Sequence, residues 1–141
     1  MNADDRLIYL IFTAQNKLRT YLNNAMTDDG VKVTVAQSGI LFLLKEKNGR
    51  SMTELSRILG IDNSTLTGLI DRLEKARLVE RNANPGDRRS SHIYMTQEGI
   101  EAANGAKRVI RRVNEKIKDG FSPEEMETFK KVLKTFFRRF A

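Results

Sequence analysis

Apolar residues recur every three or four positions along most of the chain, a spacing that predicts amphipathic helices. Two short stretches, residues 78–81 and 92–95, have strand-like patterns instead. We therefore expect a mainly α protein with a small β-hairpin. Residues 1–141 form one protomer in this interpretation. A central region at about 34–95 contains the hairpin, and further helices lie at about 4–25 and 97–140.

The central region contains two short helices separated by a tight turn. Ser51 and Glu54 have the spacing of a capping box, Gly60 suits the end of the first helix, and Asp62 suits the start of the second. One face of the first helix carries Leu55, Ile58 and Leu59, and the buried stripe of the second is Leu66, Leu69, Ile70 and Leu73. A preceding apolar helix, capped by Thr34 and closed near residue 48, would complete a three-helix core.

The face of the second helix opposite its buried stripe has an unusual composition. Its first two turns carry small and hydroxylated residues, whereas a solvated surface helix favours Glu, Lys and Ala. Short side chains that both donate and accept hydrogen bonds suit close approach to base edges in the major groove. The residues assigned to that groove are Ser64, Thr65, Thr67, Gly68 and Arg72. An ordinary amphipathic helix is the alternative.

The hairpin supports the DNA interpretation. A polar loop over residues 82–91 contains Asn84-Pro85-Gly86-Asp87, a strong turn signal, followed by Arg88 and Arg89. An arginine on a thin projecting loop suits a narrow minor groove, where negative potential is concentrated. Two helices across a turn followed by such a hairpin predict a winged helix-turn-helix domain.

The order and spacing of several short motifs resemble the MarR (multiple antibiotic resistance regulator) family of bacterial transcription factors. The motifs are Ser64-Thr65 with Thr67, Asp71-Arg72-Leu73-Glu74, Leu78-Val79-Glu80-Arg81, Asp87-Arg88-Arg89, and Met95-Thr96 with Gly99. The resemblance implies a homodimeric regulator, most often a repressor, bound to a pseudo-palindromic site in double-stranded DNA.

Some residue roles are implied by the resemblance alone. It places Arg89 in the minor groove, Asp87 as its brace and Arg88 at phosphate. Gly68 departs from the family pattern, which often has a larger basic residue there. Many relatives release DNA when a small aromatic or phenolic compound binds between the winged helix and the dimer helices. Relatives that sense oxidation use a cysteine, and this chain has none.

The terminal helices predict a contact with a second copy of the chain. The long helix from Gln97 has a thin apolar stripe edged by basic residues, which is typical of a helix–helix seam. The last helix, with Ser122 as its cap, carries several phenylalanines that need a cover. Packing within one chain is the alternative. The residues assigned to dimerisation are Leu7, Ile11, Ile110, Val113, Ile117, Phe129, Leu133, Phe136 and Phe140.

Charge supports DNA binding only weakly. The formal net charge is +7, but residues 62–106, which hold the proposed DNA-contacting elements, sum to −1, whereas residues 107–141 sum to +6. A solvated helix face explains an excess of that kind. No signal peptide or membrane-length apolar run is apparent, so we expect a cytoplasmic protein without membrane contact.

The sequence offers little for an enzyme. It contains no phosphate-binding glycine loop and no His/Cys metal spacing, so we expect neither a cofactor nor a metal. The single histidine, His92, is expected at the surface or near DNA. A helical protein-interaction or adaptor module is the other function considered, although it would not explain the arginines at the hairpin turn.

Overall fold

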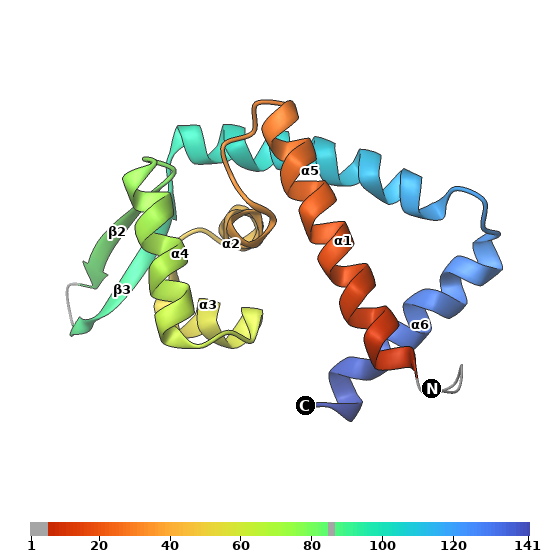
Figure 1. The fold of residues 1–141 in the computed structure, drawn as a ribbon. Coiled ribbons are helices and arrows are strands. Elements are labelled where there is room, and N and C mark those ends of the chain that lie inside the picture. The colour runs from red at the N-terminus through yellow and green to blue at the C-terminus, as the bar shows by residue number, and fades with distance from the viewer. Residues whose placement is uncertain (1–5, 85–86) are drawn as a thin grey trace. The chain divides into compact units, whose positions relative to one another are not determined.

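The computed structural model describes residues 6–84 and 87–141, and within the hairpin only the backbone of residues 83–84 and 87–90. Its elements, drawn in Figure 1, are α1 (Leu7–Asp28), α2 (Val35–Glu46), β1 (Arg50–Ser51), α3 (Met52–Leu59), α4 (Asn63–Lys75), β2 (Val79–Asn84), β3 (Asp87–Met95), α5 (Gln97–Lys118) and α6 (Pro123–Arg139). The predicted class, mainly α with a β-hairpin wing, is confirmed.

Two compact units make up the chain. The first, Met1–Val109, holds α1 to β3 and the first half of α5, and the second, Ile110–Ala141, holds the rest of α5 and α6. No helix among the described residues is long and apolar enough to cross a membrane.

Side-chain caps set the starts of several helices as the sequence predicts. The Thr34 and Ser122 hydroxyls accept hydrogen bonds from the backbone N–H groups of Gln37 and Glu125, each within a complete capping box. Gly60, with φ +65°, ends α3 in the left-handed conformation. These local signals are short-range and therefore readable from sequence.

The capping box predicted at Ser51 is only half formed. The Ser51 hydroxyl accepts from the backbone N–H of Glu54 at 3.1 Å, but the Glu54 carboxylate turns instead to Arg50, at 2.8 Å from Nη1. The buried Arg50 also donates from Nε to the Leu43 carbonyl at 3.0 Å. Arg50 thus joins α2, β1 and α3 in a charged contact inside the domain that no local sequence pattern indicates.

The core of the first unit lies where α2, α3, α4 and the sheet meet. Fully buried side chains include Ile40, Leu41, Leu44, Leu55, Leu66, Ile70, Leu73 and Ile93. Two predicted core positions differ: Ile58 is 46% exposed, and Leu69 is half-buried. Within α3, Leu55 is the apolar residue that is fully buried.

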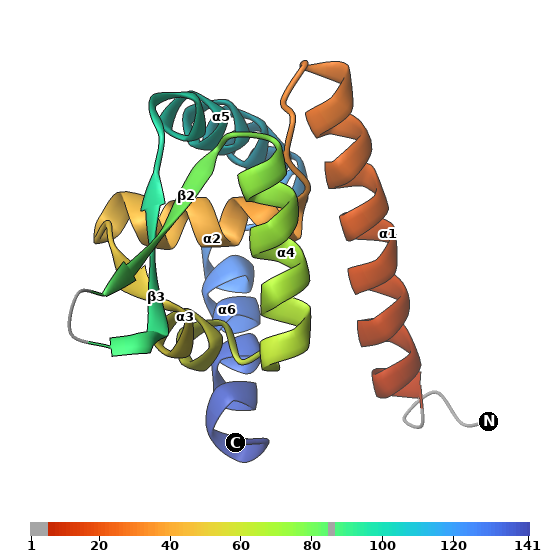
Figure 2. The same ribbon diagram turned by 90° about the vertical axis from the view of Figure 1, so that its left-hand side faces the viewer.

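The sheet has three strands in the order β1-β3-β2, all antiparallel, and β2 lies beside α4 (Figure 2). The sequence predicted two strands and missed β1, a two-residue strand that pairs Arg50 with Ile93 and Ser51 with His92. Strands β2 and β3 are also longer than predicted, since ladder pairing continues through polar residues as far as Asn84 and Asp87.

The sheet gives His92 a contact that the sequence did not indicate. His92 lies in the central strand, half-buried, with Nδ1 at 2.8 Å from the carbonyl oxygen of Gly49. A carbonyl only accepts, so Nδ1 carries the proton of this hydrogen bond. The ring thereby ties the turn before β1 to β3, which is a structural role.

The long helix α5 begins where predicted. The Thr96 hydroxyl accepts from the backbone N–H of Gly99 at 3.0 Å. Gly99 lies so close to the base of the hairpin that an added Cβ would overlap the carbonyl oxygen of Leu78, just before β2, and approach Cγ of Met95, at the end of β3, at 2.7 Å. A side chain at residue 99 would therefore push α5 away from the hairpin.

Gly99→Ala is expected to lower the free energy of unfolding by about 1–3 kcal/mol, the usual cost of overpacking, despite the better helix propensity of alanine. Gly68→Ala is the matched control, because a Cβ at that helical position meets open space. We expect Gly68→Ala to raise the free energy of unfolding by up to about 1 kcal/mol. Urea unfolding measures both. A Gly99→Ala protein as stable as Gly68→Ala would refute the close approach.

Candidate nucleic-acid interface

The start of α4 is held by one carboxylate. Asp62 Oδ1 accepts from the backbone N–H of Thr65 at 2.7 Å and from the hydroxyl of Ser64 at 3.0 Å. The hydrogen bonds from Thr65 first, and then from Ser64, hold the pKa of Asp62 below its ordinary value of 3.8. Asp62 therefore stays ionised at neutral pH, and it orients the first two hydroxylated side chains of the helix.

The predicted major-groove residues share the side of α4 that faces away from the core. Ser64, Thr65, Thr67 and Arg72 are exposed, and Gly68 is partly exposed with open space beyond its Cα. Their position follows from packing, because Leu66, Ile70 and Leu73 are completely buried on the other side of the same helix. The structure thus brings all the predicted residues of α4 onto one accessible surface.

A contact between α4 and the hairpin was not predicted. Asp71, on the accessible side of α4, accepts a hydrogen bond of 2.7 Å from Nη2 of Arg81 in β2. Both residues belonged to short motifs in the sequence, but their ten-residue separation gave no sign of pairing. Only the fold, which sets β2 against α4, brings the two charges together.

The wing arginines are placed differently from the prediction. The sequence put Arg88 and Arg89 in a polar loop over residues 82–91, whereas the backbone from Asp87 onward belongs to β3. The side chains of Asp87, Arg88 and Arg89 lie outside the described part of the chain, so their groove assignments stay predictions.

The apolar residues predicted for dimerisation are mostly accessible in the single chain. Leu7, Ile11, Phe129, Leu133 and Phe140 are exposed, while Ile110, Ile117 and Phe136 are half-buried. Val113 differs, since only 5% of its surface remains exposed, leaving little for a second chain. Phe136 and Phe140 contact each other edge to face at a centroid distance of 5.6 Å.

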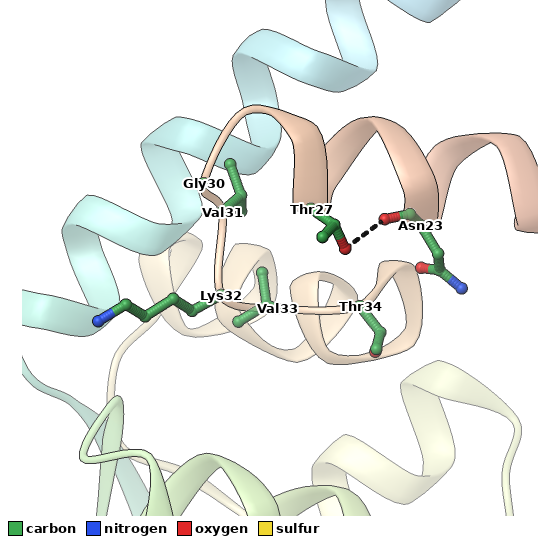
Figure 3. Close-up of a pocket in the computed structure, with 7 residues that line it drawn as sticks. All are labelled: Asn23, Thr27, Gly30, Val31, Lys32, Val33 and Thr34. Atoms are coloured by element: carbon green, nitrogen blue, oxygen red, sulfur yellow. Dashed lines mark hydrogen bonds between the residues drawn. The ribbon is translucent and has the colours of Figure 1, made fainter.

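A surface cavity lies where α1 ends and the chain turns toward α2 (Figure 3). Its lining residues are Asn23, Thr27, Gly30, Val31, Lys32, Val33 and Thr34. The Thr27 hydroxyl donates to the Asn23 carbonyl at 3.1 Å, and Asn23 Oδ1 accepts from the backbone N–H of Val35 at 2.9 Å. The cavity therefore combines amide and hydroxyl groups with two valines. The described residues include no acidic, histidine or cysteine cluster suited to a metal.

Comparison with known proteins agrees with this arrangement. Residues 31–90 match the model of the MarR family. The HTH-type transcriptional regulator PecS of Dickeya dadantii is 36% identical over 107 residues, which cover 72% of this chain and 63% of PecS.

Two solved structures show the same fold. The S. aureus MepR–DNA complex has a TM-score of 0.87 at 19% identity and covers 96% of this chain and 98% of MepR. PcaV of Streptomyces coelicolor, solved in complex with its natural ligand, has a TM-score of 0.88 at 21% identity, over 100% of this chain and 98% of PcaV. The family match, the PecS likeness and the shared fold lead to one conclusion: the chain belongs to the MarR family of winged helix-turn-helix transcription regulators.

Proposed function

We propose that two copies of this chain bind a pseudo-palindromic site in double-stranded DNA and repress transcription there. The observation that carries the proposal is the accessible surface of α4, where Ser64, Thr65, Thr67 and Arg72 lie together beside an open position at Gly68. The chemistry suits base edges, because hydroxyls both donate and accept, and arginine binds guanine or phosphate. MepR, which has the same fold, was solved bound to DNA.

The hairpin supplies the second contact in this proposal. Arg89 would enter the minor groove with Asp87 as its brace, and Arg88 would meet phosphate. The two-stranded ladder of β2 and β3 supports the proposal, because it continues to the residues that flank the turn and so extends the hairpin away from its base. Contacts in two grooves would fix both the position and the orientation of α4 on DNA.

Dimerisation is proposed on the basis of exposed apolar surface. The first turns of α1 are apolar and exposed in the single chain, at Leu7, Ile8, Tyr9, Leu10, Ile11 and Phe12. None of the residues of α6, its phenylalanines included, is buried. Exposed apolar surface of this extent, on each of the two helices by itself, marks an interaction site. A second copy covers it most simply, and two recognition helices would then reach major grooves about 34–36 Å apart.

A small aromatic or phenolic effector completes the proposal. Within the first unit, the cavity at Asn23 and Thr34 lies where α1 ends and the chain turns toward α2, so a bound compound would contact α1 and the loop that leads to the N-cap of α2. A ligand that binds this cavity better in one arrangement of the two helices would shift the protein toward that arrangement. PcaV, with the same fold, was solved with its natural ligand.

The basic test is binding to duplex DNA. Selection from a random duplex pool should yield a preferred sequence, and a gel shift at moderate salt should separate it from a shuffled duplex of equal length and composition. Equal, weak binding to both duplexes would reject the proposal and favour a helical interaction module.

Arg89→Ala is expected to weaken binding to the selected sequence by about 1–3 kcal/mol, the range for one good groove contact. Asp87→Ala should have a smaller effect in the same direction, because it removes only the brace. Fluorescence anisotropy at matched salt measures both, and thermal unfolding should show that folding is intact. An Arg89→Ala protein that binds as tightly as the parent would exclude the minor-groove role.

Phe136→Glu is expected to separate the dimer, because a buried carboxylate without a partner is strongly disfavoured and each lost phenylalanine contact costs roughly 1.5–3 kcal/mol. Losing the link between two DNA-binding domains would lower operator affinity by about 10²–10⁴-fold. Light scattering and anisotropy measure the two effects.

Thr128→Glu is the matched control for that variant, since it introduces the same charge at an exposed position of α6. The control should stay dimeric and bind normally. If Phe136→Glu behaves like Thr128→Glu, Phe136 lies outside the dimer contact.

A further inference from the structure

The accessible surface of α4 contains a carboxylate in an unexpected place. Asp71 follows Gly68 by three residues and Ser64 by seven, so it lies on the same side of the helix. Its side chain is 60% exposed. A free carboxylate here would repel the phosphates of bound DNA. In the proposed complex, the negative charge of Asp71 must therefore be neutralised by a neighbouring group.

The partner of Asp71 is held more firmly than a typical surface arginine. Arg81 has 29% of its side chain exposed, and its Nη2 is 2.7 Å from Asp71 Oδ1. Its Nε is buried and has no hydrogen-bond partner within the described part of the chain. The Nε end of the Arg81 guanidinium is therefore enclosed by protein, while Nη2 at the other end binds Asp71.

Folding stability is a poor explanation for this contact. An ion pair exposed to this degree contributes little to stability, because water screens it. A buried donor without a partner is moreover unfavourable. What the pair does provide is a fixed link between two elements, since Asp71 belongs to α4 and Arg81 is the third residue of β2.

The same link joins the two proposed DNA contacts. Strand β2 pairs with β3 along the hairpin, with Arg81 opposite Ile93, whose side chain is completely buried. A shift of the hairpin relative to α4 would change the spacing between the groove contacts of helix and wing. The Asp71–Arg81 pair opposes such a shift at the base of the hairpin.

Building on the proposed DNA-binding function, we infer that Asp71 and Arg81 are positioning residues for sequence recognition. Arg81 neutralises the carboxylate on the DNA-facing side of α4 and sets the hairpin at a fixed distance from that helix. Neither residue needs to contact DNA for this role. The pair therefore affects discrimination between sequences more than general attraction to DNA.

The test uses the full-length protein, the duplex it selects from a random pool, and a shuffled duplex of the same length. Asp71→Asn and Arg81→Gln each remove one charge of the pair with little change in size. Each variant should reduce the ratio of selected to shuffled affinity by about tenfold. The double variant should lose no more than the worse single variant, because the two changes break the same contact.

Salt dependence separates positioning from direct contact. Removing a cation that contacts phosphate lowers the slope of log affinity against log salt by about one. Arg81→Gln should leave that slope unchanged, since Arg81 is occupied by Asp71. A slope reduced by about one would identify Arg81 as a phosphate contact and overturn the inference.

Matched controls show whether the loss of discrimination comes from removing any surface charge or from a loss of stability. Glu80→Gln removes an exposed acid beside Arg81, and Lys17→Gln removes an exposed cation on α1. Both should keep the parent's affinity ratio, and all variants should unfold at temperatures close to that of the parent. Tighter or unchanged discrimination by Asp71→Asn, or additive losses in the double variant, would also overturn the role of the pair.

The inference and the function on which it rests fail in different ways. A parent protein that shows no preference for any selected duplex would refute the DNA-binding function itself. A parent that discriminates while Asp71→Asn and Arg81→Gln discriminate equally well would refute only the positioning role.

Discussion

Burial of one side of α4 is the constraint on which the proposed interface depends. Leu66, Ile70 and Leu73 are completely enclosed, and burying a side chain of this size is worth roughly 1.5–3 kcal/mol. The three anchors leave the helix no freedom to rotate about its axis. Rotation would expose them and bury Ser64 and Thr67 without partners. The chemistry on the outer side of α4 is therefore a consequence of the packing on its inner side.

The same packing organises the elements around α4. Arg50 joins α2, β1 and α3 from within the domain, His92 joins β3 to the turn before β1, and Gly99 allows α5 to approach Leu78 closely. Together these contacts fix the arrangement of the helices and strands around α4. In the proposed complex, DNA would meet a surface that is already arranged for it, which lowers the entropic cost of binding.

Much of this arrangement could be predicted from sequence, because the signals were local. Thr34, Gly60, Asp62 and Ser122 marked helix ends through capping within four residues. The features that could not be predicted depend on contacts between residues far apart in the sequence or on neighbouring elements. Strand β1 consists of only Arg50 and Ser51 and exists because β3 lies beside it, and the Asp71–Arg81 pair depends on β2 packing against α4. The exposure of Ile58 shows the same limit, since helical periodicity gives a face but not what covers it.

The most direct test of the central claim is the arrangement of sequences that the full-length protein selects from random duplex DNA. A dimer that presents two copies of α4 predicts an inverted repeat whose half-sites are centred about 10–10.5 base pairs apart. Hydroxyl-radical footprinting on the selected site should then show two protected segments with that spacing. Selection of a single unrepeated half-site, or of no sequence at all, would contradict the account.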